Sequence, residues 1–136
     1  MPARKRDFII EKGSDFQRVL YLEPGADADI RLFTARMQIR ASATGEPFLL
    51  ELTTANSRIT CDYGTITLNV PAAITTAIDT STLTSKGKVT EPAAAGKLPF
   101  EREGKIGVYD LELVSPAGIV TQYLFGQVVF VDNVTR

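Results

Sequence analysis

The chain contains no histidine, no tryptophan and only one cysteine among its 136 residues. The absence of histidine excludes Ser-His and Cys-His nucleophile arrangements and every histidine-based zinc site. A single cysteine allows neither an intramolecular disulfide nor a thiolate metal site. Acid-base chemistry would therefore have to rest on carboxylates. We expect no cofactor, no metal and no enzymatic activity.

An excess of charge of either sign is also missing. Fifteen basic and sixteen acidic residues leave a formal net charge of -1, so no strong overall field attracts nucleic acid or an anionic membrane. We interpret the basic triplet Arg4-Lys-Arg6 as a solvated, mobile terminus. The run Phe8-Ile-Ile10 is too short for a signal-peptide core, and nothing approaches the ~20 apolar residues of a membrane span. We expect a soluble protein made in the cytoplasm that binds neither nucleic acid nor membrane.

Short segments of alternating polarity, separated by turn residues, run through most of the chain. In residues 34–40, Arg36 and Gln38 alternate with Met37 and Ile39. This period of two predicts a strand with one wet and one dry face, in which Met37 and Ile39 are buried. A strand of this kind must pack its dry face on a partner sheet.

The other segments predict more strands and one helix. Residues 8–12 and 16–22 read as two strands joined by the Gly13-Ser-Asp15 turn, and residues 48–70 as a meander of hairpins. Residues 71–78 predict a short helix, because proline suits a first helical turn. We therefore predict a single all-β domain over residues 1–136, an immunoglobulin-like or related antiparallel β-sandwich of about seven to nine strands with one short helix.

The last predicted strand, residues 119–131, is apolar on both sides. Such a strand needs cover on both faces, which the helix, the segment 80–105 or a neighbouring subunit could provide. Gly126 marks a candidate bulge within it. On this strand, Phe130 is a candidate residue for contact with a partner protein.

Residues 80–105 differ in composition, with Ser, Thr, Gly, Pro and Ala in place of β-branched runs. Loops of this length are usually functional or disordered, and both alternatives are open. We expect an inserted arm whose apolar residues are too sparse for a core of their own and act as anchors on another protein. These candidate anchors are Leu83, Val89, Leu98 and Phe100.

Five segments in this order carry a resemblance to a known family: residues 34–40, 49–54, 58–60, 64–73 and 108–118. Together they resemble small β-sandwich proteins of tailed bacteriophages that are associated with the distal tail, the baseplate or fibre attachment. The likeness covers roughly residues 7–79 and 107–136, including the closing Val134-Thr-Arg136. The family pattern has no segment equivalent to residues 80–105.

The resemblance implies a structural function. It implies a virion protein of a phage tail, made in the host cytoplasm, that acts as a baseplate or tail-fibre adaptor. Its partners would be other tail, baseplate or fibre proteins, with several copies in a symmetric assembly.

Two rival functions stay open. A host-surface carbohydrate-binding module is the first, and Tyr21 is then the candidate aromatic platform. A glycan hydrolase is the second, because Asp110 and Glu112 share a strand face about 7 Å apart at the backbone. A solvated polar face explains these two carboxylates as well.

Two further residues have a chemical and a structural interpretation. Asp29, with Asp27, could contribute to a calcium site, but a full set of liganding oxygens is missing and a polar turn fits better. Cys61 lies in the alternating run 59–63, and we interpret it as a small core residue because no histidine could activate it.

Overall fold

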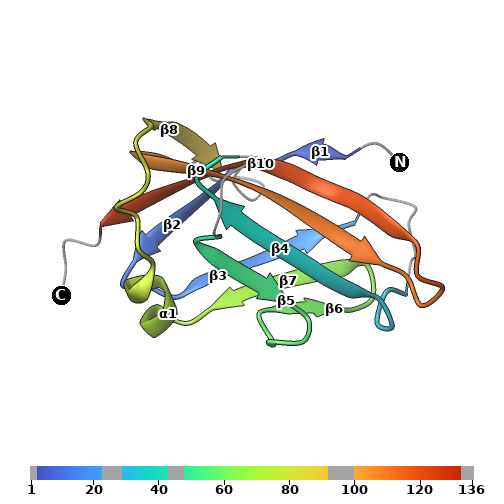
Figure 1. The fold of residues 1–136 in the computed structure, drawn as a ribbon. Coiled ribbons are helices and arrows are strands. Elements are labelled where there is room, and N and C mark those ends of the chain that lie inside the picture. The colour runs from blue at the N-terminus through green and yellow to red at the C-terminus, as the bar shows by residue number, and fades with distance from the viewer. Residues whose placement is uncertain (1–2, 23–28, 43–47, 92–99, 133–136) are drawn as a thin grey trace.

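The computed structural model describes residues 3–22, 29–42, 48–91 and 100–132. These residues form ten strands and one short helix, which confirms the predicted all-β sandwich with a strand count slightly above the prediction (Figure 1). The elements in chain order are β1 (Arg4–Lys5), β2 (Phe8–Lys12), β3 (Phe16–Tyr21), β4 (Thr34–Arg40), β5 (Leu50–Thr53), β6 (Ile59–Cys61), β7 (Thr65–Val70), α1 (Ala72–Ala77), β8 (Lys86–Glu91), β9 (Phe100–Val114) and β10 (Val120–Asp132).

The strands form two sheets that face each other. The large sheet has the order β1-β10-β9-β4-β5, with β2 also paired to β10 and β8 also paired to β9. The small sheet has the order β3-β7-β6. Side chains from both sheets fill the space between them, and we call this cluster the main core.

The alternation in β4 has the predicted consequence. Met37 and Ile39 are fully buried in the main core, whereas Arg36 is exposed and Gln38 is partly exposed on the opposite face. The dry face packs against the small sheet because removing apolar surface from water is the dominant favourable term in folding.

Two turns join the two sheets, and one of these connections differs from the prediction. Strand β2 pairs in parallel with β10, and β3 pairs with β7 in the other sheet, so the Gly13 turn joins the sheets and forms no hairpin. Likewise β5 belongs to the large sheet and β6 to the small one. The meander predicted over residues 48–70 is therefore wrong, because within it only β6 and β7 pair with each other.

Helix α1 confirms the predicted helix and closes one end of the sandwich (Figure 1). Pro71 precedes its first turn, and the carboxylate of Asp15 accepts a hydrogen bond from the Ala72 backbone nitrogen at 2.7 Å. The buried hydroxyl of Thr75 donates to the carbonyl oxygen of Ser14 at 2.8 Å. These contacts attach the helix to the turn between β2 and β3.

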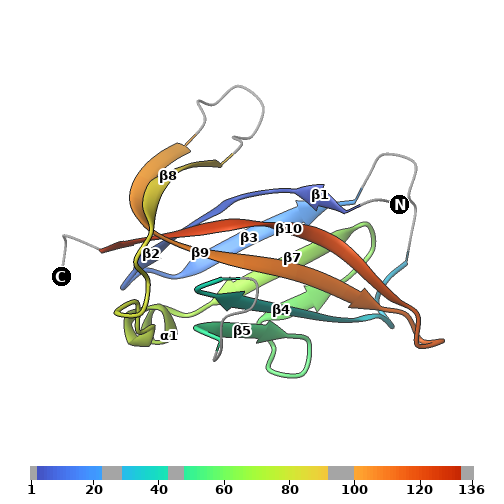
Figure 2. The same cartoon turned by 45° about the horizontal axis from the view of Figure 1, so that its top comes forward.

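The segment predicted to be an inserted arm forms, in part of its described residues, a hairpin that packs on the sandwich. Strand β8 pairs antiparallel with residues 100–105 of β9, and this hairpin curves away over the outer face of the large sheet (Figure 2). Beneath it, Val89 packs with Ile9 and Val129 in a second cluster. The described residues of 80–105 thus have no core of their own, as predicted, but Leu83 and Val89 are buried on the sandwich and are not exposed anchors. The hairpin supplies the second cover that the doubly apolar β10 requires.

A glycine permits the close crossing of this hairpin and β10. A Cβ on Gly104 would collide with the carbonyl oxygen of Phe130. Because that atom belongs to the backbone, it cannot move aside as a side chain can. Gly104 therefore lets β9 lie directly against β10 at the point where the second cluster begins.

The hairpin is also joined to the small sheet through an ion pair. The Arg18 Nε donates to the buried Glu91 carboxylate at 2.7 Å. Both side chains bond the backbone of Ile9: Glu91 accepts from its nitrogen, and Arg18 donates to its oxygen at 3.1 Å. The pair thus satisfies backbone groups on the edge of β2, which would otherwise present unpaired groups.

The N-terminal strand runs parallel along β10 and bends where Gly126 faces it. The register of β9 and β10 shifts between Gln122 and Leu124, which places the bulge three residues before the predicted Gly126. Gly126 instead allows a close approach, since a Cβ there would collide with the carbonyl oxygen of Arg6. Arg4 and Lys5 are exposed, as predicted for the basic triplet, and they form β1.

Candidate functional site

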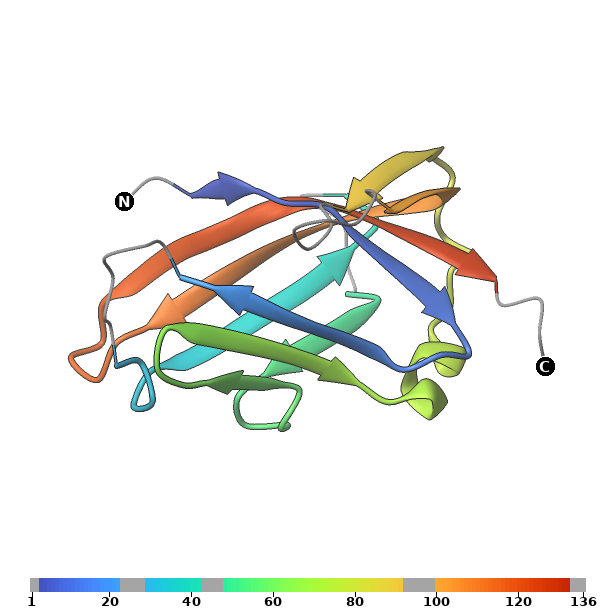
Figure 3. The same ribbon diagram turned by 180° about the vertical axis from the view of Figure 1, so that it is seen from behind.

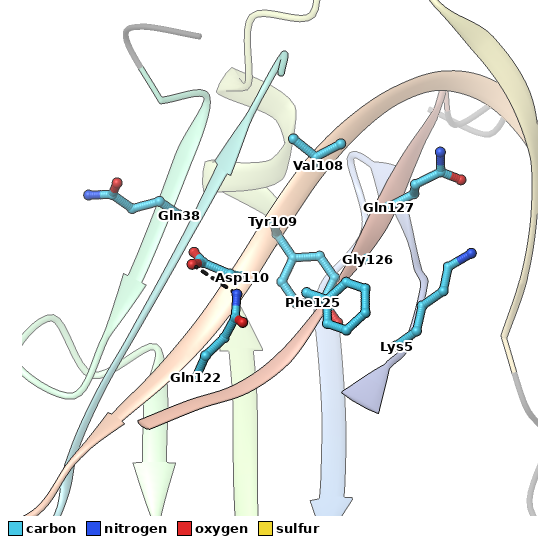
Figure 4. A pocket seen from close by; sticks show the side chains of 9 residues that line it. All are labelled: Lys5, Gln38, Val108, Tyr109, Asp110, Gln122, Phe125, Gly126 and Gln127. Atoms are coloured by element: carbon cyan, nitrogen blue, oxygen red, sulfur yellow. Dashed lines mark hydrogen bonds between the residues drawn. The ribbon is translucent and has the colours of Figure 1, made fainter. Parts of the chain in front are cut away.

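The outer face of the large sheet carries a groove centred on Phe125. Four neighbouring strands align Lys5, Phe125, Asp110 and Gln38 in one row, because each is the register partner of the next. The space above them has a volume of about 570 Å³. Figure 4 shows Phe125 near the centre of the groove, with polar side chains around it. The groove therefore combines one apolar surface with several hydrogen-bonding groups.

The floor of this groove is held in place by a buried tyrosine. The hydroxyl of Tyr109 donates a hydrogen bond to the carbonyl oxygen of Arg6, which joins β9 to the connection between β1 and β2. Burial raises the pKa of the Tyr109 phenol, so it stays a neutral donor across the physiological range. Phe125 lies beside Gly126 at this junction, and its ring is 40% exposed. The aromatic surface is thus presented from a fixed backbone.

Of the two carboxylates considered for a hydrolase, Asp110 lines the groove, and Glu112 lies in a neighbouring hollow with Arg36. Glu112 accepts from the Arg36 Nε at 2.8 Å, and Asp110 accepts from the Gln122 amide at 3.5 Å (Figure 4). Both side chains are accounted for by a polar network on an exposed sheet face. These contacts agree with the interpretation as a solvated face.

A second surface lies at the end of the sandwich opposite α1 and β8 (Figures 1 and 3). The turns and the first residue of β10 at this end present four large apolar residues, which we call the apolar end: Leu32, Tyr63, Ile119 and Val120. Their exposed fractions are 81% for Leu32, 66% for Ile119, 59% for Tyr63 and 50% for Val120. Scattered exposed apolar residues are normal, whereas several of them at one end make that end a candidate interaction surface.

The turns of the apolar end are held by local contacts. The Asp29 carboxylate accepts from the Arg31 side chain at 2.9 and 3.0 Å, and these hydrogen bonds lower the pKa of Asp29. The same guanidinium lies 4.1 Å from the centre of the Tyr63 ring. Asp29 thus serves a turn, as predicted, while Asp27 lies outside the described residues. Within the described ranges, no group of three or more Asp, Glu or Cys side chains could hold a metal ion.

The predicted partner-contact residues fall in three environments. Leu83 and Phe130 are buried in the main core, and Val89 is buried in the second cluster. These three cannot act as exposed anchors in this conformation, because the chain covers them itself. Phe100 is 42% exposed, with the Arg102 guanidinium 4.2 Å from its ring centre. Leu98 lies outside the described residues.

Cys61 is half-buried and packs against the main core. Burial raises the pKa of its thiol, which favours the protonated, unreactive form. This position is closer to the predicted core residue than to a reactive thiol, although the side chain is less buried than expected.

Neither the groove nor the apolar end could be recognised in the sequence. In the sequence, Phe125 was one of several apolar residues on a strand with two apolar faces. The register shift between Gln122 and Leu124 packs Tyr123 against the main core, whereas Phe125 is exposed on the outer face. The turn residues carried no periodicity that could reveal their exposure.

Comparison with known proteins adds no assignment. No protein-family model matches this chain, and no curated protein matches it. In the part of the chain that the structure describes, no helix is long and apolar enough to cross a membrane.

Proposed function

We propose that this protein is a non-enzymatic structural component of a tailed-phage virion, a baseplate or tail-fibre adaptor that docks on other tail proteins. The observation that carries the proposal is the apolar end, at which Leu32 and Ile119 are mostly exposed. The order of strand segments that resembles the phage family supports the same function. In the particle, several copies would each present this end to a neighbouring tail protein.

The physical argument rests on the cost of leaving this surface in water. Covering a large apolar side chain contributes about 1.5–3 kcal/mol. Four such residues on one end provide the apolar centre that protein interfaces combine with a polar rim. The ion pair of Arg31 with Asp29 lies beside Tyr63 and supplies part of such a rim.

The test is to add charge at the apolar end and to measure incorporation into particles. Leu32→Glu combined with Ile119→Glu should leave the isolated protein folded, because both side chains are exposed. We expect its amount in purified virions, measured by mass spectrometry, to fall at least tenfold. Burying two unpaired charges in an apolar interface is strongly unfavourable.

A matched control adds the same two charges on another face. Val19→Glu with Thr60→Glu alters the outer face of the small sheet, where both residues are exposed. This variant should enter virions at the wild-type level. Equal incorporation of both double variants would contradict docking through the apolar end, and absence of the wild-type protein from virions would contradict the proposed function altogether.

A further inference from the structure

The groove around Phe125 has a floor that the large sheet holds in place. Its lining comes from four strands that lie side by side in that sheet, β1, β10, β9 and β4. Two contacts fix β1 against its neighbours: the Tyr109 hydroxyl donates to the Arg6 carbonyl oxygen, and Gly126 lets that backbone approach β10 closely. A ligand therefore meets side chains whose spacing is already set, which lowers the entropic cost of binding.

Phe125 offers an aromatic face in the middle of this floor. Its side chain is 40% exposed, and Val108 on the neighbouring strand adds partly exposed apolar surface to the same lining. Aromatic rings stack on flat, weakly polar surfaces. The centre of the groove therefore fits the C–H face of a ring-shaped ligand.

Amide and carboxylate groups surround this aromatic centre (Figure 4). The Gln122 amide donates to one oxygen of Asp110 at 3.5 Å, and the other oxygen of that carboxylate has no hydrogen-bond partner among the described residues. The Gln38 amide is oriented by Glu51, to which it donates at 2.7 Å. The Gln127 side chain makes no hydrogen bond to another described residue. The groove thus keeps hydrogen-bonding capacity that the chain itself does not use.

The two ionic neighbours of Phe125 indicate what kind of polar ligand fits. Lys5 and Asp110 lie on either side of Phe125, because each is its register partner on an adjacent strand. A charged group above the ring would be attracted by one of them and repelled by the other. A hydroxyl group suits both, since it accepts from an ammonium and donates to a carboxylate. The arrangement therefore favours an uncharged ligand with several hydroxyl groups.

We infer that this groove binds a neutral saccharide, with one sugar ring stacked on Phe125. The C–H face of the sugar covers the aromatic ring, and its hydroxyl groups pair with Asp110, Gln122 and Gln127. The volume of about 570 Å³ lies within the range of small-ligand sites, roughly 300–1,000 Å³. It exceeds what one sugar ring fills, so the ligand is a short oligosaccharide.

This inference goes beyond the proposed docking function and is independent of it. The apolar end and the groove use different side chains, and binding of a saccharide requires no particle. Failure of one therefore leaves the other standing.

The experiment applies the full chain to an array of neutral glycans that includes oligosaccharides of maltose, cellulose, mannan and chitin. Each glycan that binds is then titrated by isothermal calorimetry. We expect at least one neutral oligosaccharide to bind, and its monosaccharide unit to bind more weakly. Because the ligand is uncharged, raising the salt concentration should change the affinity by less than about twofold.

Variants connect the binding to the groove. Phe125→Ala should weaken the glycan by about tenfold or more, whereas Phe125→Tyr keeps the ring and should bind within about threefold of the wild type. The matched control is Phe100→Ala, because Phe100 is exposed to a similar extent, 42%, on the β8 hairpin. Melting temperatures are measured in parallel to show that each variant is folded.

A second pair of variants tests the polar groups. Gln122→Ala should weaken the glycan by about threefold or more, since it removes a hydrogen-bonding partner of the sugar. The control Gln17→Ala removes an exposed glutamine on the small sheet and should bind as the wild type does.

Three results would overturn the inference: no neutral glycan binds, binding disappears at high salt, or Phe125→Ala binds as Phe100→Ala does. A further contrary result is a Phe125→Ala protein that binds no less glycan but is depleted from virions. The groove would then be a docking surface for another protein.

Discussion

The main core and the second cluster differ in how they are closed. The main core lies between two sheets and draws side chains from both of them. The second cluster is centred on Ile9, Val89 and Val129 and is covered only by the β8 hairpin. One face of the large sheet therefore packs on the small sheet, whereas the hairpin covers the opposite face only around Ile9 and Val129.

This difference predicts which region stabilises the whole domain and which region can open by itself. Loss of a main-core side chain affects contacts between the two sheets, so we expect the whole domain to weaken. The hairpin is attached by a few side chains and by the Glu91–Arg18 pair, so we expect it to open without unfolding the sandwich. Such separate opening units are common in native proteins.

The largest effect should follow a cavity in the main core. Ile39→Ala removes a fully buried side chain and should lower the free energy of unfolding by about 2–5 kcal/mol. Chemical denaturation measures this loss. The control Thr34→Ala, at an exposed position of the same strand, should change it by less than about 0.5 kcal/mol. Similar losses for the two variants would show that the face assignment of β4 is incorrect.

The next effect concerns the contact between the hairpin and β10. Gly104→Ala places a methyl group against the backbone of Phe130 and should cost about 1–3 kcal/mol, as overpacking does. Hydrogen exchange should accelerate in β8 and residues 100–105, while β3 and β7 keep their protection. Uniform acceleration in both regions would mean that the hairpin does not open separately.

A smaller effect is expected at the ion pair that joins the two regions. Glu91→Gln leaves the Arg18 side chain without its charged partner, and we expect a loss of about 1–2 kcal/mol after allowing for the partial exposure of Arg18. Thermal unfolding measures it. Glu103→Gln, an exposed position on the same hairpin, is the control. If both variants melt at the same temperature, the pair does not fasten the hairpin.

The smallest effect lies outside both clusters, at Asp29. Hydrogen bonds from Arg31 lower the pKa of Asp29 below its ordinary value of 3.8. The contribution to stability is therefore present above that ordinary pKa and is lost as the pH falls through the lower folded value. We expect the melting temperatures of wild type and Asp29→Asn to differ slightly at pH 6 and to converge near pH 2. A difference that grows toward acid pH would contradict this sign.

Much of the fold could be predicted because it depends on local patterns. The alternation in β4 indicated which side chains are buried, and Pro71 marked the start of a short helix. The pairing of strands could not be predicted from the same patterns. Alternation with a period of two predicts that a side chain points inward, but it does not predict in which sheet the strand lies.

The candidate sites show the same limit. Asp110 and the basic triplet stood out in the sequence, yet nothing there indicated that Asp110 and Lys5 line one groove, because the two are separated by more than a hundred residues. Phe125 was visible only as one more apolar residue on a strand with two apolar faces. Its exposure depends on where the covering hairpin ends, which is a tertiary property.

The sequence by itself determined the class of fold, the wet and dry faces of its strands and the chemistry that a chain without histidine cannot perform. The tertiary structure decided that the chain crosses between sheets at Gly13, that residues 86–91 and 100–105 form a hairpin over β10, and that four strands form the groove around Phe125. The physical reason is the separation along the chain over which each interaction acts. Side-chain alternation is set by backbone geometry within a few residues, whereas the choice of partner strand depends on packing among segments far apart in the chain.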